Sequence, residues 1–234
     1  MSMTMSLLAG LVLGQSAGID DVWQTGLKDV SFRTKVGKAV QKELQKINKD
    51  FATSYRFDYT DVKMKEPMKL RVESVVEGTS LLYIVNGTDR LFSMRGIKQR
   101  EDLSKSPGKR QTAFDFGLLP KSLFDEYLVA KFVRIDRRSN EPVFDLTYNP
   151  KTGDTARHRV WVDRTRKFVT RREWYSQAGN LMATFVYSNP KEFSGVWLPT
   201  RMEVSNAEGK FAGVTDYVNI KVNAGLSDSL FSTK

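Results

Sequence analysis

From about residue 55 onward, hydrophobic and polar side chains alternate with a period of two, which is typical of β-strands that pack one face on a core. Tyr55, Phe57 and Tyr59 alternate with charged residues where this pattern starts. Turn signals such as Asn86-Gly87 and Asn189-Pro190 divide the chain into runs of strand length. The pattern predicts about eleven strands, near residues 55–62, 69–76, 81–86, 90–94, 131–136, 142–149, 157–163, 168–175, 180–188, 197–205 and 211–222. Their short connections predict antiparallel neighbours in one large meandering sheet.

Ahead of these strands, the hydrophobic period is that of a helix. Val36, Val40, Leu44, Ile47 and Phe51 follow steps of four, four, three and four, so they share one side of a helix. Lysines occupy its other faces, namely Lys35, Lys38, Lys42, Lys46 and Lys49. The stripe predicts a helix docked on the core. In a functional interpretation, the stripe covers a groove as a lid helix while the lysines face an anionic surface.

A sheet of about eleven twisted strands curls, closes or splits into two layers. The run Leu81–Val85 is apolar on both faces, so both faces of the sheet need a cover. The stretch from Arg95 to Ala130 shows no strand alternation and predicts a short helix near Lys121 to Leu128. A connection of that length is functional or disordered, and we favour a lid. We therefore expect a mainly β (α+β) fold: an unclosed, curled half-barrel of antiparallel strands, with the N-terminal helix and a helical lid insertion at about 95–130 covering the concave face.

The N-terminus carries a candidate export signal. Residues 1–18 contain the apolar run Leu7–Leu13 followed by small residues. This is typical of a signal peptide, except that the basic residues at its start are missing, which a misassigned start codon would explain. The alternative is a frayed apolar end of a cytosolic protein. The run is far shorter than the about 20 apolar residues that span a bilayer. We expect residues 19–234 to form a single domain that is exported and periplasmic.

Little in the sequence points to catalysis. The chain has no cysteine and one histidine, which excludes thiolate nucleophiles, disulfides and multi-histidine metal sites. His158 lies between two arginines without an evident nucleophile, and Asp61, Glu66, Asp145 and Asp163 form no recognisable constellation. We predict no catalytic residue, no metal site and no cofactor.

Positive charge is concentrated in three segments. The formal net charge is +10, and residues 33–51, 95–110 and 156–172 each carry a clear excess of basic side chains. This predicts one or more basic faces. A nucleic-acid binder would add aromatic stacking platforms such as Trp161 and Trp174. The predicted export argues against that partner, so we expect no nucleic acid.

Several segments resemble a known family. They are Arg157-His158-Arg159-Val160-Trp161-Val162-Asp163, Arg171-Arg172-Glu173-Trp174-Tyr175, Gly195-Val196-Trp197-Leu198-Pro199-Thr200-Arg201, and the ending from Val222 to Phe231. In order and spacing they resemble the LolA-like family of outer-membrane lipoprotein-sorting proteins. The resemblance implies an eleven-stranded unclosed barrel with a helical lid, an apolar cavity for acyl chains, and a periplasmic role without catalysis. In LolA a buried arginine latches the lid, and the resemblance assigns that role to no particular arginine of this chain.

The candidate site follows from the predicted faces. The expected wall of the lipid cavity comprises Leu70, Val72, Ile84, Phe144, Leu146, Val160, Phe185, Met202 and Val218. The alternative is that these residues form a filled, dry core. Candidates for contact with a headgroup or a membrane lie in the insertion, namely Lys98, Arg100, Lys105, Lys109 and Arg110. Ordinary solvated loop charge is the alternative for them. A second basic cluster surrounds Trp161 and is interpreted as a structural cation–π stack.

The expected function is that of a non-catalytic carrier or chaperone for acyl chains in outer-membrane sorting. Its partners would be an acylated lipoprotein or a lipid, with transient contact to a membrane surface or a membrane protein. The alternative is a lipid-responsive envelope sensor or partner-binding module of the same fold. Cargo and oligomeric state are left open.

Overall fold

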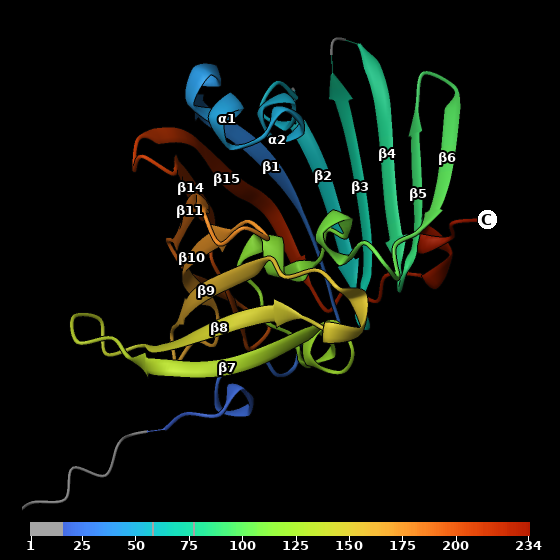
Figure 1. Cartoon of the computed structure of the whole chain (residues 1–234). Coiled ribbons are helices and arrows are strands. Elements are labelled where there is room, and N and C mark those ends of the chain that lie inside the picture. The colour runs from blue at the N-terminus through green and yellow to red at the C-terminus, as the bar shows by residue number, and fades with distance from the viewer. Residues whose placement is uncertain (1–15, 58, 77) are drawn as a thin grey trace, which may run out of the picture.

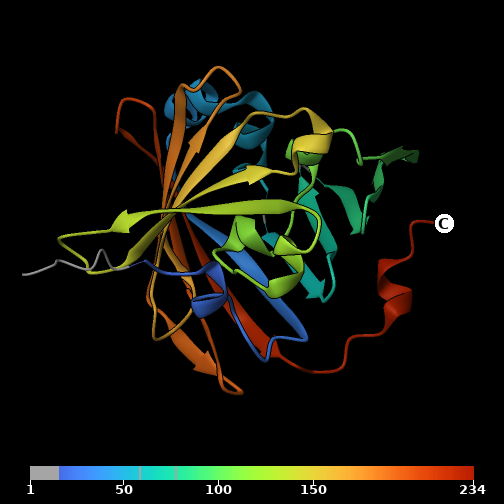
Figure 2. The ribbon, with the colours of Figure 1, turned by 60° about the horizontal axis from the view of Figure 1, so that its bottom comes forward.

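The computed structural model describes residues 16–57, 59–76 and 78–234. Within these ranges, thirteen strands form one antiparallel sheet in the order β6-β5-β4-β3-β2-β1-β15-β14-β11-β10-β9-β8-β7. The sheet curls around its contents without closing, since β6 and β7 are its two edges (Figures 1 and 2). The predicted curled, unclosed antiparallel half-barrel is confirmed, with a slightly different number of strands.

The strands have the following bounds: β1 Asp29–Ala39, β2 Tyr59–Lys65, β3 Lys69–Val76, β4 Thr79–Asn86, β5 Asp89–Met94, β6 Ile97–Asp102, β7 Leu128–Ile135, β8 Pro142–Tyr148, β9 Arg157–Val162, β10 Val169–Tyr175, β11 Leu181–Ser188, β14 Arg201–Asn206 and β15 Phe211–Val222. Two further short strands, β12 Lys191–Phe193 and β13 Val196–Leu198, pair only with each other in the described part of the chain. The predicted strand at 197–205 is therefore two strands, and the one at 55–62 begins only at Tyr59. β1, β6 and β12 were not predicted.

The N-terminal helix is shorter than its hydrophobic spacing predicted. Val36 lies in β1, opposite Thr215 of β15, and Val40 is the residue that precedes helix α1. The helical part is α1 Gln41–Ile47 and α2 Lys49–Ser54, which Asn48 separates with an extended backbone. The Asn48 side chain accepts hydrogen bonds from the N–H groups of Asp50 and Phe51 and so caps α2. The strand replaces the start of the predicted helix because β1 pairs with β15 as far as Ala39 and with β2 as far as Thr34.

The insertion is also shorter than predicted. Residues 97–102 form the edge strand β6 and residue 128 already begins β7, so the connection covers residues 103–127. It contains the short 3-10 helices η2 Pro107–Lys109, η3 Ala113–Phe116 and η4 Lys121–Phe124, the last in place of the predicted helix near 121–128. We call residues 103–127 the plug, because this segment lies inside the curl of the sheet (Figures 1 and 2).

The strand register defines two faces, since residues directly opposite each other in antiparallel strands share a face. Phe32 is opposite Val62, and Val62 is opposite Val72. These side chains point to the concave face, where the ring of Phe116 in the plug lies 5.3 Å from that of Phe32, centroid to centroid. Arg33 and Asp61 are opposite each other on the convex face.

The convex face of β3–β5 is covered by the C-terminal segment. Its short helix η6 Asp228–Phe231 places Phe231, fully buried, against Ile84 and Leu91. The Asp29 carboxylate accepts hydrogen bonds from the N–H groups of residues 224–226 and fixes the start of this segment. The expectation that the run Leu81–Val85 needs a cover on both faces is met on this side by the chain itself.

The predicted export signal lies mostly outside the described residues, which begin at residue 16. Among the described residues, no helix combines the length and apolar character needed to cross a membrane.

Candidate functional site

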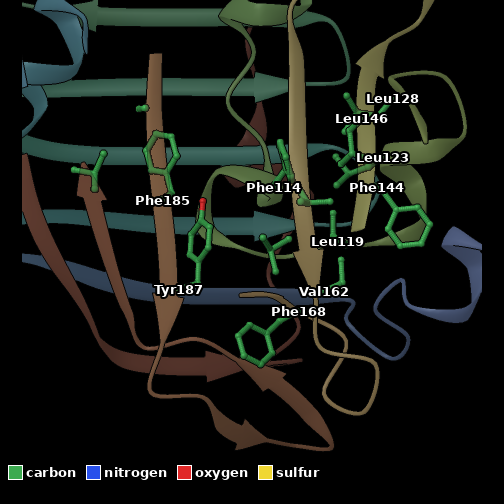
Figure 3. Close-up of a cluster of buried hydrophobic side chains, with 14 of the residues drawn as sticks. Phe114, Leu119, Leu123, Leu128, Phe144, Leu146, Val162, Phe168, Phe185 and Tyr187 are labelled. Atoms are coloured by element: carbon green, nitrogen blue, oxygen red, sulfur yellow. The ribbon is translucent and has the colours of Figure 1, made fainter. Parts of the chain in front are cut away.

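The concave face of β7–β11 and β14, here called the filled half, is packed with apolar side chains from the plug. Phe114, Leu119 and Leu123 of the plug are each at most 3% exposed. Figure 3 shows Phe114 and Leu119 between β11, which carries Phe185 and Tyr187, and the side chains of Phe144 and Leu146 on β8. This half is a close-packed core.

The structure brings most of the predicted cavity residues to the concave face. Phe144, Leu146, Val160 and Phe185 belong to the filled half, and Met202 packs against its edge. Leu70 and Val72 belong to a second concave cluster, together with Ala113 and Leu118 of the plug. Seven of the nine predicted residues thus face the same enclosed space, and this space is occupied by the plug.

Ile84 and Val218 lie on the opposite face. Ile84 is opposite Arg71, which is on the convex side with Lys63, and Ile84 is buried under the C-terminal segment. Val218 is opposite Arg33 on the same convex side. They are therefore not part of the concave wall. The prediction failed for Ile84 because its strand is apolar on both faces, so alternation alone could not assign the face.

The predicted lid helix covers the filled half from another side. Leu44 and Ile47 are buried in the same cluster as Phe185, and the ring of Phe51 lies 5.9 Å from the ring of Phe185. Val36 and Val40 do not lie on this helix, as described above. The segments that cover the filled half are thus α1 and α2 together with the plug.

A buried ion pair joins the plug to the sheet. The Arg172 side chain on β10 is 6% exposed and donates a hydrogen bond to Asp115 in η3 across 2.9 Å. Its guanidinium carbon lies 4.1 Å from the ring centre of Phe185 and 4.9 Å from that of Phe114. Burial alone would lower the pKa of the Arg172 guanidinium. The nearby Tyr187 and Asp115 outweigh this effect and raise the pKa, so the group stays cationic.

Asp115 is in turn fixed by local hydrogen bonds. Its carboxylate accepts the N–H of Thr112 at 3.0 Å, and its carbonyl accepts the hydroxyl of Tyr187 at 3.1 Å. Gly117 ends this turn with a φ of +83°, and a Cβ there would lie 2.8 Å from the Tyr187 ring. The turn therefore needs glycine both for its conformation and for the close approach of Tyr187. Arg172, Asp115 and Tyr187 together hold the plug against the wall.

His158 lies beside this pair as a buried neutral group. Its Nε2 is 3.4 Å from the Tyr148 hydroxyl, and its ring packs edge-on against Phe114. Burial lowers the pKa of His158 well below its usual value, and the charges of Arg172 and Arg157 lower it further. The imidazole is therefore a buried, neutral polar group that packs against Tyr148 and Phe114.

The concave face of β4–β6 differs from the filled half because its apolar side chains are not fully covered. We call these side chains the open face: Leu81, Tyr83, Phe92, Met94 and Ile97. The register places them together: Leu81 is opposite Met94, Tyr83 is opposite Phe92, and Met94 is opposite Ile97. Ile97 is 61% exposed, and the other four are partly exposed. Helices α1 and α2 lie over the other part of the sheet and not over these strands (Figure 1).

The predicted headgroup residues are divided by the structure. Lys98 and Arg100 point to the convex side of β6, where Arg100 Nε donates to the carbonyl of Thr233. Lys105 and Lys109 line a polar surface pocket with Thr152 and Asp154, among others. Arg110 is half-buried over the ring of Tyr127. Of the five, Lys109 and Arg110 lie beside the open face, since the hydroxyl of Tyr83 bonds to the backbone of residues 109 and 111.

The second basic cluster is divided, because Arg172 is buried on the concave side whereas Arg159 and Arg171 lie on the convex side. Trp161 lies under the guanidinium groups of Arg171 at 4.8 Å and Arg134 at 5.8 Å, whereas Arg159 pairs with Asp145. The predicted cation–π stack is present, with Arg171 and Arg134 as its members.

Comparisons with known proteins agree with this geometry. A LolA superfamily protein from Nitrosomonas europaea is 19% identical, with 92% of this chain and 94% of that chain covered at a TM-score of 0.58. A DUF1329 family protein from Desulfovibrio piger is 17% identical, with 92% of each chain covered and a TM-score of 0.59. An outer membrane lipoprotein-sorting protein domain from Vibrio parahaemolyticus is 14% identical, with 92% and 93% covered and a TM-score of 0.58.

These matches define the fold as LolA-like, which confirms the predicted resemblance. A family model described as an uncharacterized protein matches residues 113–234, more than half of the chain, and the chain belongs to that family. No curated protein matches the chain.

Sequence reasoning missed the Arg172–Asp115 pair. The two residues are 57 positions apart, and the basic segment around Arg172 contains six other cations. One signal was available: by alternation along β10, Arg172 shares a face with Trp174 and not with Arg171 and Glu173. An arginine at a core position of a strand indicates a buried partner.

Proposed function

We propose that this protein is a non-catalytic periplasmic carrier or chaperone that binds the acyl chains of lipids or lipoproteins on its concave face, for sorting to the outer membrane. The observation that carries the proposal is the unequal cover of that face. The filled half is closed by a plug that an ion pair holds in place, and beside it the open face leaves apolar side chains in contact with solvent. A partly exposed apolar face next to a displaceable segment suits an acyl chain.

The LolA-like fold supports this proposal. Two proteins of similar fold are described as a LolA superfamily protein and as an outer membrane lipoprotein-sorting domain. At below 20% identity these structures share the fold with this chain, so the cargo and the location belong to the proposal.

The energetics favour exchange over tight storage. Moving a methylene from water to an apolar site yields about 0.8 kcal/mol, so enclosing long chains from water would exceed the practical ceiling of non-covalent affinity. A cargo chain starts in a membrane, which is already apolar, and further entry must displace Phe114 or Leu119 from the filled half. Uptake is therefore close to balanced, as a carrier that releases its cargo requires.

The test is native mass spectrometry of the exported protein purified without detergent, followed by organic extraction and identification of lipids. We expect a discrete adduct that resolves into acyl lipid. A mass that stays that of the free chain after incubation with lipids and acylated peptide would contradict the proposal and favour a partner-binding module.

Two matched variants locate the site. Phe92→Asp places a charge on the open face and should abolish the adduct. Val186→Asp places the same charge at a 44% exposed apolar residue on the convex face of β11 and should leave the adduct unchanged. Equal loss in both variants would mean that the acyl chain does not bind at the open face.

A further inference from the structure

Arg110 is a half-buried cation for which the described residues supply no direct ion pair, although the charge of Asp102 acts on it from further away. Its guanidinium carbon lies 4.6 Å from the ring centre of Tyr127, and its Nε is buried without a hydrogen-bond partner. Within residues 16–57, 59–76 and 78–234, no carboxylate forms an ion pair with it. Burial lowers the pKa of Arg110, although a guanidinium stays protonated at neutral pH. The fold thus keeps a cation where desolvation is only partly offset.

Two tyrosines fix the backbone around Arg110. The hydroxyl of Tyr127 donates to the carbonyls of Pro107 at 3.1 Å and Arg110 at 3.2 Å. The hydroxyl of Tyr83 donates to the carbonyl of Lys109 at 3.1 Å and accepts the N–H of Gln111 at 3.4 Å. Tyr83 is itself a member of the open face. Arg110 is therefore held at the border between the plug and that face.

The nearby carboxylates are already engaged. Glu101 pairs with Arg90 at 2.5 Å and with Lys109 at 3.1 Å. Asp102 accepts hydrogen bonds from the N–H and hydroxyl of Ser104. Positive charge is therefore in excess at the Arg90 end of the open face, where three cations, Arg90, Lys109 and Arg110, lie near the two carboxylates. The contrast with Arg172 is direct, because that buried arginine has Asp115.

The open face continues from this basic end toward an apolar rim. On β5, Arg90, Phe92 and Met94 share the concave face, and at about 3.4 Å per residue the step from Arg90 to Met94 covers roughly 14 Å. A molecule with an anionic head and an apolar tail matches this order of charge and apolar surface.

We propose that Arg110 binds the anionic head, a phosphate or carboxylate, of an amphiphile whose chain lies along Phe92 and Met94. The inference rests on the proposed function and narrows it, since it selects anionic over nonionic cargo. Arg110 would form charge-assisted hydrogen bonds with the head, and Lys109 and Arg90 would add to the local positive potential.

The test is calorimetric titration of the whole chain with dodecyl phosphate and with dodecyl maltoside, each below its critical micelle concentration. Both probes have the same chain, and only the first has an anionic head. We expect the wild type to bind dodecyl phosphate at least ~10-fold more tightly. Arg110→Gln should remove that preference and leave dodecyl maltoside binding within about twofold, and Arg110→Lys should retain part of it.

The matched control is Lys98→Gln, which removes one charge from the convex side of β6, and it should leave both affinities unchanged. Equal binding of both probes by the wild type, or an equal loss of both in Arg110→Gln, would overturn the role of Arg110 while leaving an acyl carrier intact. Binding of neither probe would overturn the proposed function and this inference together. Inorganic phosphate that binds as tightly as dodecyl phosphate would show that free phosphate, not an amphiphile, is the ligand.

Discussion

The two halves of the concave face use the same alternating strands but differ in what covers them. On β8–β11, side chains such as Phe144 and Leu146 are 0–1% exposed, because the plug packs on them. On β4–β6, Phe92 and Met94 occupy equivalent inward positions but remain partly exposed. In the described part of the chain, Leu81, Phe92 and Met94 belong to none of the core clusters. Strand pairing thus determines which face a residue takes, and the connecting segment determines whether that face becomes core or surface.

The largest expected effect is a difference in stability between the halves. Phe144→Ala in the filled half should lower the free energy of unfolding by about 4 kcal/mol, because it leaves a cavity in a close-packed core. Phe92→Ala on the open face should cost about 1 kcal/mol or less, because water already reaches that ring. Urea unfolding of both variants measures this difference. Similar losses would mean that the open face is as tightly covered as the filled half.

The ion pair between Arg172 and Asp115 gives the next largest effect. Asp115→Asn leaves a buried guanidinium without its counter-ion and should cost about 2 kcal/mol, reduced from the fully buried case because the Asp115 side chain is 34% exposed. Urea unfolding checks the loss, and proteolysis within residues 103–127 should become faster as the plug loosens.

Asp61→Asn is the matched control for this pair. The Asp61 side chain is 33% exposed, nearly the same as Asp115, but its partner Arg33 is 36% exposed on the convex face. We expect a cost of about 0.5 kcal/mol and no change in proteolysis of the plug. Equal costs for the two substitutions would show that burial of the arginine adds nothing to the pair.

The sequence supports prediction of the strands better than prediction of their cover. Alternation located β3 and β8 correctly because each has one consistently apolar face, as in Leu70 and Val72. It missed β1 because Val36 fits both a strand period and a helical spacing with Val40 and Leu44, and only pairing with β2 and β15 decides between them. Pairing with the neighbouring strand β3, where Arg71 is opposite, likewise decides that Ile84 is convex.

The candidate site was predictable only in part, for a related reason. The apolar wall follows from local pattern, but the partner of Arg172 and the lack of one for Arg110 depend on how the plug folds back. The plug has no regular period, and its conformation is set by turns at Thr112 and Gly117 and by contacts with distant strands. Charge in the sequence indicated basic segments but not which cation lies beside the open face.

The smallest expected effect concerns pH and the filled half alone. His158 is neutral in the folded chain because burial, and then the charges of Arg172 and Arg157, hold its pKa well below 6.5. The unfolded chain takes up a proton near pH 6.5, so this group contributes its full stability above that pH and loses it as the pH falls toward the folded pKa. The loss is at most about 1.4 kcal/mol per pH unit.

Buried carboxylates change stability in the opposite direction, because burial raises the pKa values of Glu66 and Glu141 and favours their protonated forms on acidification. Comparing the wild type with His158→Gln cancels the contribution of these two carboxylates, since both proteins contain Glu66 and Glu141. We expect the stability advantage of the wild type, measured by urea unfolding, to shrink by about 1 kcal/mol between pH 7.5 and 5.5. An advantage that stays constant over this range would mean that His158 is reached by solvent and that the filled half is less tightly closed at β9 than its packing indicates.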